Sequence, residues 1–385
     1  MKMGSMFLMA CLCVLFPAGS IQVSQDESTQ PTLVWMANNT HYPFSEFSPM
    51  AHEGVVCASN NRGLRLITIE TGEEIWNKKL LTSMVPLIDC GHMYYVNKML
   101  WGGFSQLNCY STTTDSLLWT QRVRGRPTFL PVIVEEKMIL TSGAYSEIVG
   151  RDPVNENWIL CLNKYTGAQI WGYEGQGKMN SSPSVVDHTV YASSSEGILY
   201  AVDLESGDLK WIYTARPSPF MSKTPCVYGE KVYHVGEELH CLNLVGEFLW
   251  NVPVQCDQKV WASSHRLYTM ADDHVISMDA DMGDILWKYP IDNYFFATAV
   301  GGWEHIFFGD DRTVYCLSRE GKLLWKYPIQ DHDDFFIHST PLLYEGYLIM
   351  GTSLGHVYTF QLPGEWCYQE AEAMYEDGDL ERARG

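Results

Sequence analysis

Positive charge is scarce in this sequence. The 385 residues include 26 Lys and Arg against 46 Asp and Glu, which gives a formal net charge of −20 at pH 7. Proteins that bind nucleic acid neutralise its phosphates with a basic surface, so this balance argues against a nucleic-acid partner. It also opposes spontaneous docking on an anionic bilayer. Solubility is the ordinary consequence of such a charge.

Long hydrophobic runs are confined to the N-terminus. The apolar segment Met6–Phe16 precedes the small residues Ala18, Gly19 and Ser20, which predicts a secretory signal peptide over residues 1–20. The segment is too short to favour a permanent membrane span. Leu8-Met9-Ala10-Cys11 also resembles a bacterial lipobox, and contact with a membrane is expected only if Cys11 is lipidated. We therefore expect an exported protein, periplasmic, extracellular or at the cell surface, with a linker over residues 21–30.

Cysteine motifs are also missing, although the chain has 11 cysteines. There is no CxxC pair, no Cys-Cys step and no histidine at the spacing of a zinc site. Nine cysteines remain after removal of the signal peptide, so at least one stays unpaired or bonds another chain. These absences point away from a zinc site or a haem-attachment motif, and we expect no metal and no cofactor.

What the chain does contain is a tryptophan that returns about every 40 residues, a period typical of stacked or radial units of a few strands each. The series is Trp35, Trp76, Trp119, Trp171, Trp211, Trp250, Trp287 and Trp325. We expect these side chains to dock one unit against the next. The residues that differ between the units are then the candidates for function.

A tight turn precedes nearly every tryptophan. Glycine stands four residues before it in six of seven copies, for example Gly207 before Trp211, and Asp115 takes the place in the seventh. Both residue types tolerate the left-handed backbone that a hairpin turn requires. A short polar residue such as Asp203 opens each turn, where its side chain bonds the turn backbone. The unit therefore reads as strand, turn, and strand carrying the tryptophan.

A second hairpin lies upstream of each such unit. Its first strand often follows a proline, as at Pro183 and Pro225, and proline suits the first residue of a strand. Four short antiparallel strands in each period predict a propeller blade. Seven blades end in a tryptophan, while an eighth has three strands near the C-terminus, finishing at Val357–Phe360. We expect Thr32–Trp35 to supply its missing outer strand and so leave no unpaired edge.

The expected fold is therefore all-β: an eight-bladed β-propeller of four-stranded antiparallel blades over residues 31–361, closed by the N-terminal strand. The same register accounts for four cysteines. Cys109, Cys161, Cys241 and Cys316 share one inner-strand position that small residues occupy in other blades, such as Ala201. A free cysteine at such a site behaves as a small hydrophobe, so we expect core packing there.

The repeat resembles the tryptophan-docking motif of PQQ-like propellers. Leu199-Tyr-Ala-Val-Asp203-Leu-Glu-Ser-Gly207-Asp-Leu-Lys-Trp211 carries the resemblance, and Asn163-Lys-Tyr-Thr-Gly167-Ala-Gln-Ile-Trp171 is a second copy. The resemblance covers roughly residues 31 to 361. It implies the fold more strongly than a task, because one propeller fold hosts many functions.

This superfamily includes the assembly lipoprotein BamB and quinoprotein alcohol dehydrogenases, which leaves three functions open. The first is a non-catalytic scaffold that binds protein partners, as in BamB-like outer-membrane protein assembly. The second is a PQQ-dependent dehydrogenase, but family enzymes carry an adjacent cysteine pair and a Ca²⁺ site, and this chain has no Cys-Cys step. The third is a ligand-binding sensor. We favour the scaffold and expect no enzyme activity.

Candidate partner-binding residues lie in the loops that join each outer strand to the next inner strand. These loops converge on one face of a propeller, and here they are rich in aromatic residues and methionine, side chains that suit protein recognition. Aromatic rings that plug a central channel are the equal alternative. The candidates are Phe47, Met84, Phe129, Met179, Phe220, Met221, Phe296, Phe335 and Phe336.

Two further segments depart from the repeat. The interval from Trp119 to Trp171 is 52 residues, and its excess around Ser142–Asn157 forms a candidate binding loop that includes Arg151. The composition changes again after Gly364. Residues 362–385 are expected to form a short acidic helical tail, either a frayed end or the start of a tetratricopeptide-type helical pair.

Overall fold

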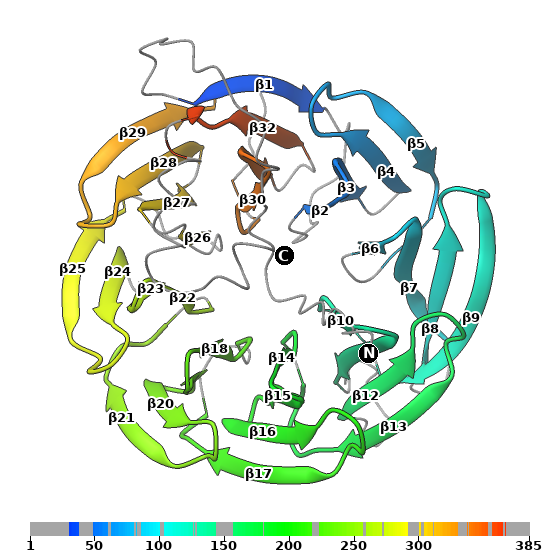
Figure 1. Ribbon diagram of the computed structural model, residues 1–385, viewed down its shortest axis with the longest axis horizontal. Coiled ribbons are helices and arrows are strands. Elements are labelled where there is room, and N and C mark those ends of the chain that lie inside the picture. Colours follow the sequence, from blue (N-terminus) through cyan, green and yellow to red (C-terminus); the bar gives the residue numbers. More distant parts are fainter. Residues whose placement is uncertain are drawn as a thin grey trace, which may run out of the picture. The chain divides into compact units, whose positions relative to one another are not determined.

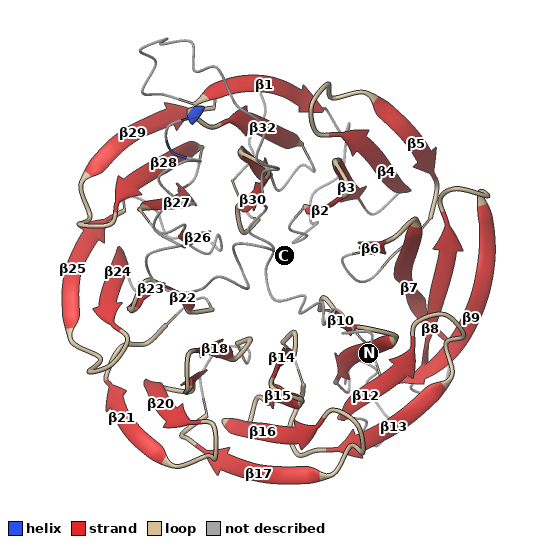
Figure 2. Ribbon diagram, in the orientation of Figure 1, coloured by secondary structure: helices blue, strands red, loops and turns tan. Residues whose placement is uncertain are grey.

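The computed structural model describes residues 31–366 except 38–48, 61–62, 81, 83–85, 101–103, 126, 128, 144–156, 180, 218–222, 257–258, 272, 292–299, 302–303, 311, 330–336, 338, 353–355 and 365. Strands make up most of the described part, and one short helical turn lies near its C-terminal end (Figure 2). The described residues fall into two compact units. One spans Leu80–Val260, and the other joins the residues up to Lys79 with those from Trp261 onward.

The first unit contains four four-stranded antiparallel sheets, or blades, each built from consecutive strands (Figure 1). Their strands are β6 (Leu87–Asp89), β7 (His92–Leu100), β8 (Phe104–Ser111) and β9 (Ser116–Arg124); β10 (Val132–Val134), β11 (Lys137–Ser142), β12 (Trp158–Asn163) and β13 (Gln169–Glu174); β14 (Ser184–Val186), β15 (Thr189–Ser193), β16 (Ile198–Asp203) and β17 (Leu209–Thr214); and β18 (Cys226–Tyr228), β19 (Lys231–Val235), β20 (Leu239–Asn243) and β21 (Phe248–Val252).

The second unit also contains four such blades. Their strands are β22 (Trp261–Ser263), β23 (Arg266–Ala271), β24 (His274–Asp279) and β25 (Ile285–Pro290); β26 (Val300–Gly301), β27 (His305–Asp310), β28 (Thr313–Ser318) and β29 (Leu323–Pro328); β30 (Leu342–Tyr344), β31 (Tyr347–Gly351), β32 (Val357–Gln361) and β1 (Thr32–Ala37); and β2 (Met50–His52), β3 (Val55–Asn60), β4 (Gly63–Thr68) and β5 (Glu74–Lys78).

The strand β1 confirms the predicted role of the N-terminal segment. It pairs antiparallel with β32, so that Trp35 lies opposite Thr359, and it becomes the fourth strand of the blade that β30–β32 begin. The two ends of the propeller sequence therefore share one sheet. The predicted fold class, an all-β propeller of eight four-stranded antiparallel blades, is confirmed.

The recurring tryptophans dock one blade on the next. Within the first unit, the Trp171 indole N–H donates to the Leu204 carbonyl of the following blade at 2.9 Å. Gly207, with φ +76°, lies against the same ring, and a Cβ at this position would stand 2.7 Å from the indole. The glycine therefore serves both the turn and the close approach of two blades. The indoles of Trp35, Trp119, Trp211 and Trp287 make equivalent hydrogen bonds to the next blade.

The polar residue that opens each turn binds the turn backbone as predicted. The Asp203 carboxylate accepts hydrogen bonds from the backbone N–H groups of Glu205 and Ser206 at 3.0 and 2.9 Å. Those bonds, led by the one from Ser206, together with Lys210 lower the pKa of Asp203 to about 2. The ionised carboxylate thus fixes the turn that presents the docking glycine.

The second and third strands of each blade form the core. Their side chains are buried on both faces, as in β15 and β16, whereas the fourth strands alternate between exposed and partly buried residues. The four register-matched cysteines, at 0% exposure, lie in this core. Each is paired opposite the blade's tryptophan, for example Cys161 opposite Trp171. The prediction of cysteine as a small core residue is confirmed.

The C-terminal segment replaces a turn in the blade that contains β1. That blade's fourth strand is β1, so among the described residues no docking glycine lies against Trp325 of the preceding blade. Leu362 and Trp366 pack there instead, and the Trp366 ring stacks on His305 with a centroid separation of 4.2 Å. The rest of the expected tail, residues 367–385, lies outside the described part, as does the expected signal and linker region, residues 1–30. Across the described residues, no helix has the length and apolarity needed to span a membrane.

Candidate protein-interaction surface

Most predicted partner-binding residues fall outside the described part of the chain. These are Phe47, Met84, Arg151, Phe220, Met221, Phe296, Phe335 and Phe336. The structure places the other two, Phe129 and Met179, in different connections of the first unit. Phe129 is half-buried in the loop between β9 and β10.

Met179 is a core residue in this structure. Its side chain is 1% exposed and belongs to the hydrophobic cluster that includes Ile198 and Tyr200. Its Cε lies so close to Gly175 that a Cβ there would collide with it. The position of Met179 in a loop suggested exposure, but the neighbouring strands cover the side chain. Met179 therefore offers a partner no surface in this conformation.

The blade formed by β6–β9 differs from its neighbours in length. β7, β8 and β9 have 9, 8 and 9 residues. The corresponding strands of the next blade, β11, β12 and β13, have 6 residues each. β9 continues for five residues past Trp119, whereas β13 continues for three past Trp171. We call the end of β9, Gln121–Arg124, and the β8 residues paired with it the β8–β9 extension. Sequence analysis missed this feature because the tryptophan interval of this blade is close to the average.

Two arginines mark the extension. The Arg122 guanidinium carbon lies 4.0 Å from the ring centroid of Phe104, and that of Arg124 lies 4.7 Å from the ring centroid of Trp158. Both arginines are exposed, while Val123 between them is buried. Neither guanidinium has a carboxylate partner among the described residues. The rings hold the two cations in place while leaving their hydrogen-bond donors available.

The backbone of β9 is equally accessible. β9 is the last strand in the order β6-β7-β8-β9, and no described strand pairs with its outer edge. A single register shift lies before Trp119, after which β8 and β9 pair without interruption from Cys109↔Trp119 to Phe104↔Arg124. The outer edge of β9 is therefore long, regular and flanked by two positive charges.

A buried serine–histidine pair was not anticipated from the sequence. Ser193 of β15 and His234 of β19 are both fully buried, and Ser193 Oγ lies 3.2 Å from His234 Nδ1. His234 Nε2 lies 3.0 Å from the Gly197 carbonyl, which can only accept a hydrogen bond. The Nε2 atom is therefore the donor, and Nδ1 accepts from Ser193. Because substrate cannot reach either atom, this pair joins two blades rather than acting as a nucleophile and base.

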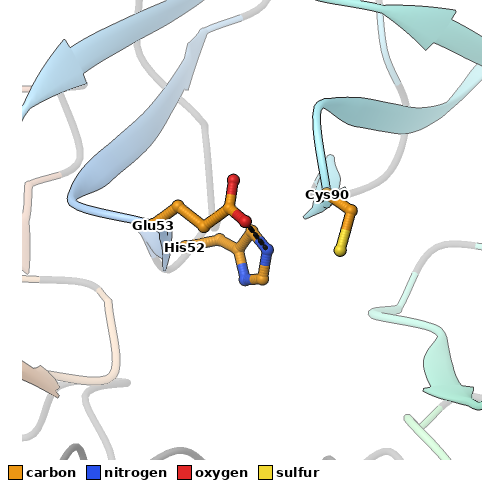
Figure 3. A group of neighbouring side chains, drawn as sticks. All are labelled: His52, Glu53 and Cys90. Carbon is orange, nitrogen blue, oxygen red and sulfur yellow. Dashed lines mark ion pairs between the residues drawn. The ribbon is translucent and has the colours of Figure 1, made fainter.

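A half-buried histidine and an exposed carboxylate also approach one another at the end of β2. His52 Nε2 and Glu53 Oε1 are 3.8 Å apart, and the dashed line in Figure 3 marks this contact. Glu53 is largely exposed and has φ 49°, which places it in the turn before β3. Cys90, also labelled in Figure 3, is an exposed residue in the β6–β7 turn of the other unit. The described contact is a surface ion pair of small energetic weight.

The buried thiols are poorly suited to chemistry. Desolvation raises the pKa of Cys57 and Cys161 to about 12 and that of Cys109 to about 11. A thiol acts as a nucleophile or metal ligand in its ionised form. These groups therefore stay protonated and inert at neutral pH.

Comparison with known proteins identifies the family to which this chain belongs. The family model for the outer membrane protein assembly factor BamB matches residues 52–289 and 236–365. The chain belongs to the BamB family. No protein of curated function matches the sequence.

Solved structures include both BamB and quinoprotein enzymes. BamB from Moraxella catarrhalis is 16% identical, with a TM-score of 0.70 over 87% of this chain and 98% of that one. The quinohemoprotein alcohol dehydrogenase from Comamonas testosteroni is 13% identical, with a TM-score of 0.66 over 87% of this chain and 77% of that one. A europium-containing methanol dehydrogenase is 11% identical, with a TM-score of 0.68 over 89% and 95%. At these identities the likeness shows the fold alone.

Proposed function

We propose that this BamB-family chain is an exported, non-catalytic propeller that binds protein partners during assembly of the cell envelope. The observation that carries this proposal is the match of the BamB family model to two overlapping parts of the propeller, residues 52–289 and 236–365. Export is supported by the predicted signal peptide over residues 1–20. The acidic net charge of −20 agrees with a protein that avoids nucleic acid and bare anionic bilayers.

The described surface suits binding better than catalysis. Its distinctive polar groups, the Arg122 and Arg124 guanidiniums, are exposed on a rigid strand edge. The serine–histidine pair that could suggest a nucleophile is closed to solvent. Arginine presented beside aromatic rings on a rigid element is typical of protein-recognition surfaces. The predicted loop residues, Phe335 and Phe336 among them, are proposed as a separate binding surface.

Photo-crosslinking from defined positions tests the scaffold. A photoreactive phenylalanine analogue is placed at Phe129 or Phe335, and at Asn251, an exposed residue of β21, as the matched control. We expect one protein partner to be crosslinked in intact cells from the loop positions and not from Asn251. Equal crosslinking from all three positions would contradict a defined loop face.

A pull-down experiment tests the same face by loss of function. The double substitution Phe335→Ala/Phe336→Ala should reduce partner recovery while leaving the thermal unfolding midpoint near that of the wild type. Unchanged recovery would remove these two residues from the binding site. Failure of the wild-type protein to capture any partner would count against the scaffold itself.

A dehydrogenase is the second candidate because two of the similar structures are quinoprotein-type alcohol or methanol dehydrogenases. The sequence lacks the adjacent cysteine pair that such enzymes carry beside the quinone. Purified protein is therefore incubated with pyrroloquinoline quinone and Ca²⁺, and dye-linked oxidation of simple alcohols is measured. We expect no quinone-dependent turnover, and reproducible turnover would replace the scaffold with an enzyme.

A further inference from the structure

The outer strands of most blades are protected against pairing with another chain. An exposed strand edge is a ready template for a further strand, and short length, proline and charged residues are the usual protections. The regular part of β13, from its tryptophan to its end, covers only Trp171–Glu174. β25 and β29 end in Lys288-Tyr289-Pro290 and Lys326-Tyr327-Pro328, so a proline closes each edge. These strands leave little room for an added strand.

β9 has neither the short length nor the proline of these strands, and charge is its remaining protection. Its regular part extends over Trp119–Arg124 without proline, glycine or a further register shift. Six residues is the typical length of a strand in a globular protein. No described strand pairs with this edge, and the outward backbone groups of these residues have no partner among the described residues. Figure 1 shows β9 as the outer strand of its blade.

The side chains beside this edge indicate which peptide would fit. Thr120, Arg122 and Arg124 alternate with inward residues and are all exposed. Side chains two residues apart on a strand lie on one face, so an added strand would place its own alternate side chains opposite the two arginines. Arginine pairs best with carboxylates, which accept its forked donors. The complementary segment is extended and carries acidic residues at every second position.

We propose that the outer edge of β9 binds an extended acidic segment of a partner protein as a fifth strand of its blade. Backbone hydrogen bonds along Trp119–Arg124 provide the pairing, and Arg122 and Arg124 select carboxylates. This proposal rests on the scaffold role proposed above and assigns that role a second surface, separate from the loop residues. It also assigns a function to the β8–β9 extension.

The binding test uses a fluorescein-labelled nine-residue peptide of alternating Val and Glu, titrated with the full-length mature protein while fluorescence anisotropy is measured. We expect saturable binding. The variant Arg122→Glu/Arg124→Glu should weaken it by at least about tenfold, because two attractive cross-strand pairs become repulsive. The variant Arg122→Lys/Arg124→Lys should retain most of the affinity. The matched control is Lys288→Glu/Lys326→Glu on the proline-closed strands, which should bind as the wild type does.

Two modified peptides separate strand addition from simple charge attraction. N-methylation of alternate peptide nitrogens removes the donors that a fifth strand needs, and in one of the two registers it should abolish binding. Replacing Glu with Lys in the peptide should also abolish binding. The proposal would be overturned if both N-methylated peptides bound as tightly as the unmethylated peptide. It would also be overturned if Arg122→Glu/Arg124→Glu bound the peptide as tightly as the wild type, or if the wild type did not bind it. Far-UV circular dichroism of each variant confirms that the blades are intact.

Failure of this proposal is distinguishable from failure of the scaffold role. If the wild type and Arg122→Glu/Arg124→Glu crosslink the same partner from Phe129 with equal yield, and the peptide does not bind, the edge has no such function and the scaffold stands. If peptide binding follows the expected pattern, the edge is a binding site whether or not the loop residues also contact a partner.

Discussion

Acidification should weaken the contact between the β14–β17 and β18–β21 blades through His234. Burial is the main cause that lowers the pKa of this histidine, from its ordinary value of 6.5 to about 4; the Gly197 carbonyl raises it and nearby His240 lowers it further. The native state therefore holds the neutral ring, which donates to Gly197 and accepts from Ser193. The unfolded chain takes up a proton below pH 6.5, while the native state does so only near pH 4.

The sign and size of the effect follow from this difference. A histidine whose folded pKa is depressed contributes its full stability above pH 6.5 and loses it as the pH falls toward 4. At about 1.4 kcal/mol for each pH unit, the free energy of unfolding falls by roughly 3 kcal/mol across this window. That loss is a large fraction of the stability of an ordinary domain.

The assay compares denaturant unfolding of the wild type and His234→Gln at pH 7.5 and pH 4.5, followed by tryptophan fluorescence. Other groups titrate over the same range, so the informative quantity is the difference between the two proteins. We expect the wild type to lose about 2 to 3 kcal/mol more than the variant. The control His188→Asn replaces an exposed histidine at a turn position with φ 56° and should follow the wild type. Equal pH dependence of wild type and His234→Gln would refute the reasoning.

Three further outcomes are expected. Gly207→Ala places a Cβ 2.7 Å from the docked indole at φ +76°, so its thermal midpoint should fall well below that of Gly229→Ala, which has φ +56° and no atom within 4 Å. Lys164 Nζ lies 2.6 Å from the carboxylate of Asp89, whose side chain is 10% exposed. Lys164→Met leaves this carboxylate buried without its cation and should reduce the free energy of unfolding by about 3–5 kcal/mol. Asp89→Leu/Lys164→Met should recover most of that loss. In a timed alkylation followed by mass spectrometry, Cys90 should react first, because it is the exposed residue among the described cysteines. Early labelling of the buried thiols would contradict this order.

The blade pattern could be predicted because it depends on a short residue pattern that recurs in each blade. A left-handed glycine, a polar turn residue and a tryptophan at fixed spacing define one hairpin, and repetition removes the ambiguity of any single copy. The contact between Gly207 and Trp171 could not be read in the same way, because it joins residues of different blades. The sequence explains the glycine through its φ angle, whereas the structure adds the close approach of the indole.

The exposure of a loop side chain is harder to predict because it depends on neighbours that are distant in sequence. Met179 lies in a connection rich in polar residues, yet Ile198 and Tyr200 cover it. The β8–β9 extension left only a weak signal. After Trp119 the alternation continues through Arg124, whereas three other copies reach a proline three residues after the tryptophan, at Pro253, Pro290 and Pro328. A comparison of strand ends between copies, rather than of tryptophan intervals, would have found it.

The repeat itself explains why a binding edge can exist in one blade. Docking requires the tryptophan, the bulge before it and the glycine of the next blade that faces its ring. The parts that β9 supplies lie at or before Trp119. Residues beyond the tryptophan do not take part in that contact, so they can lengthen without disturbing the packing of blades. Lengthening exposes backbone donors and acceptors, which is a hazard unless a partner or a charge covers them. Arg122 and Arg124 supply the charge, and their preference for carboxylates makes this edge selective for acidic strands.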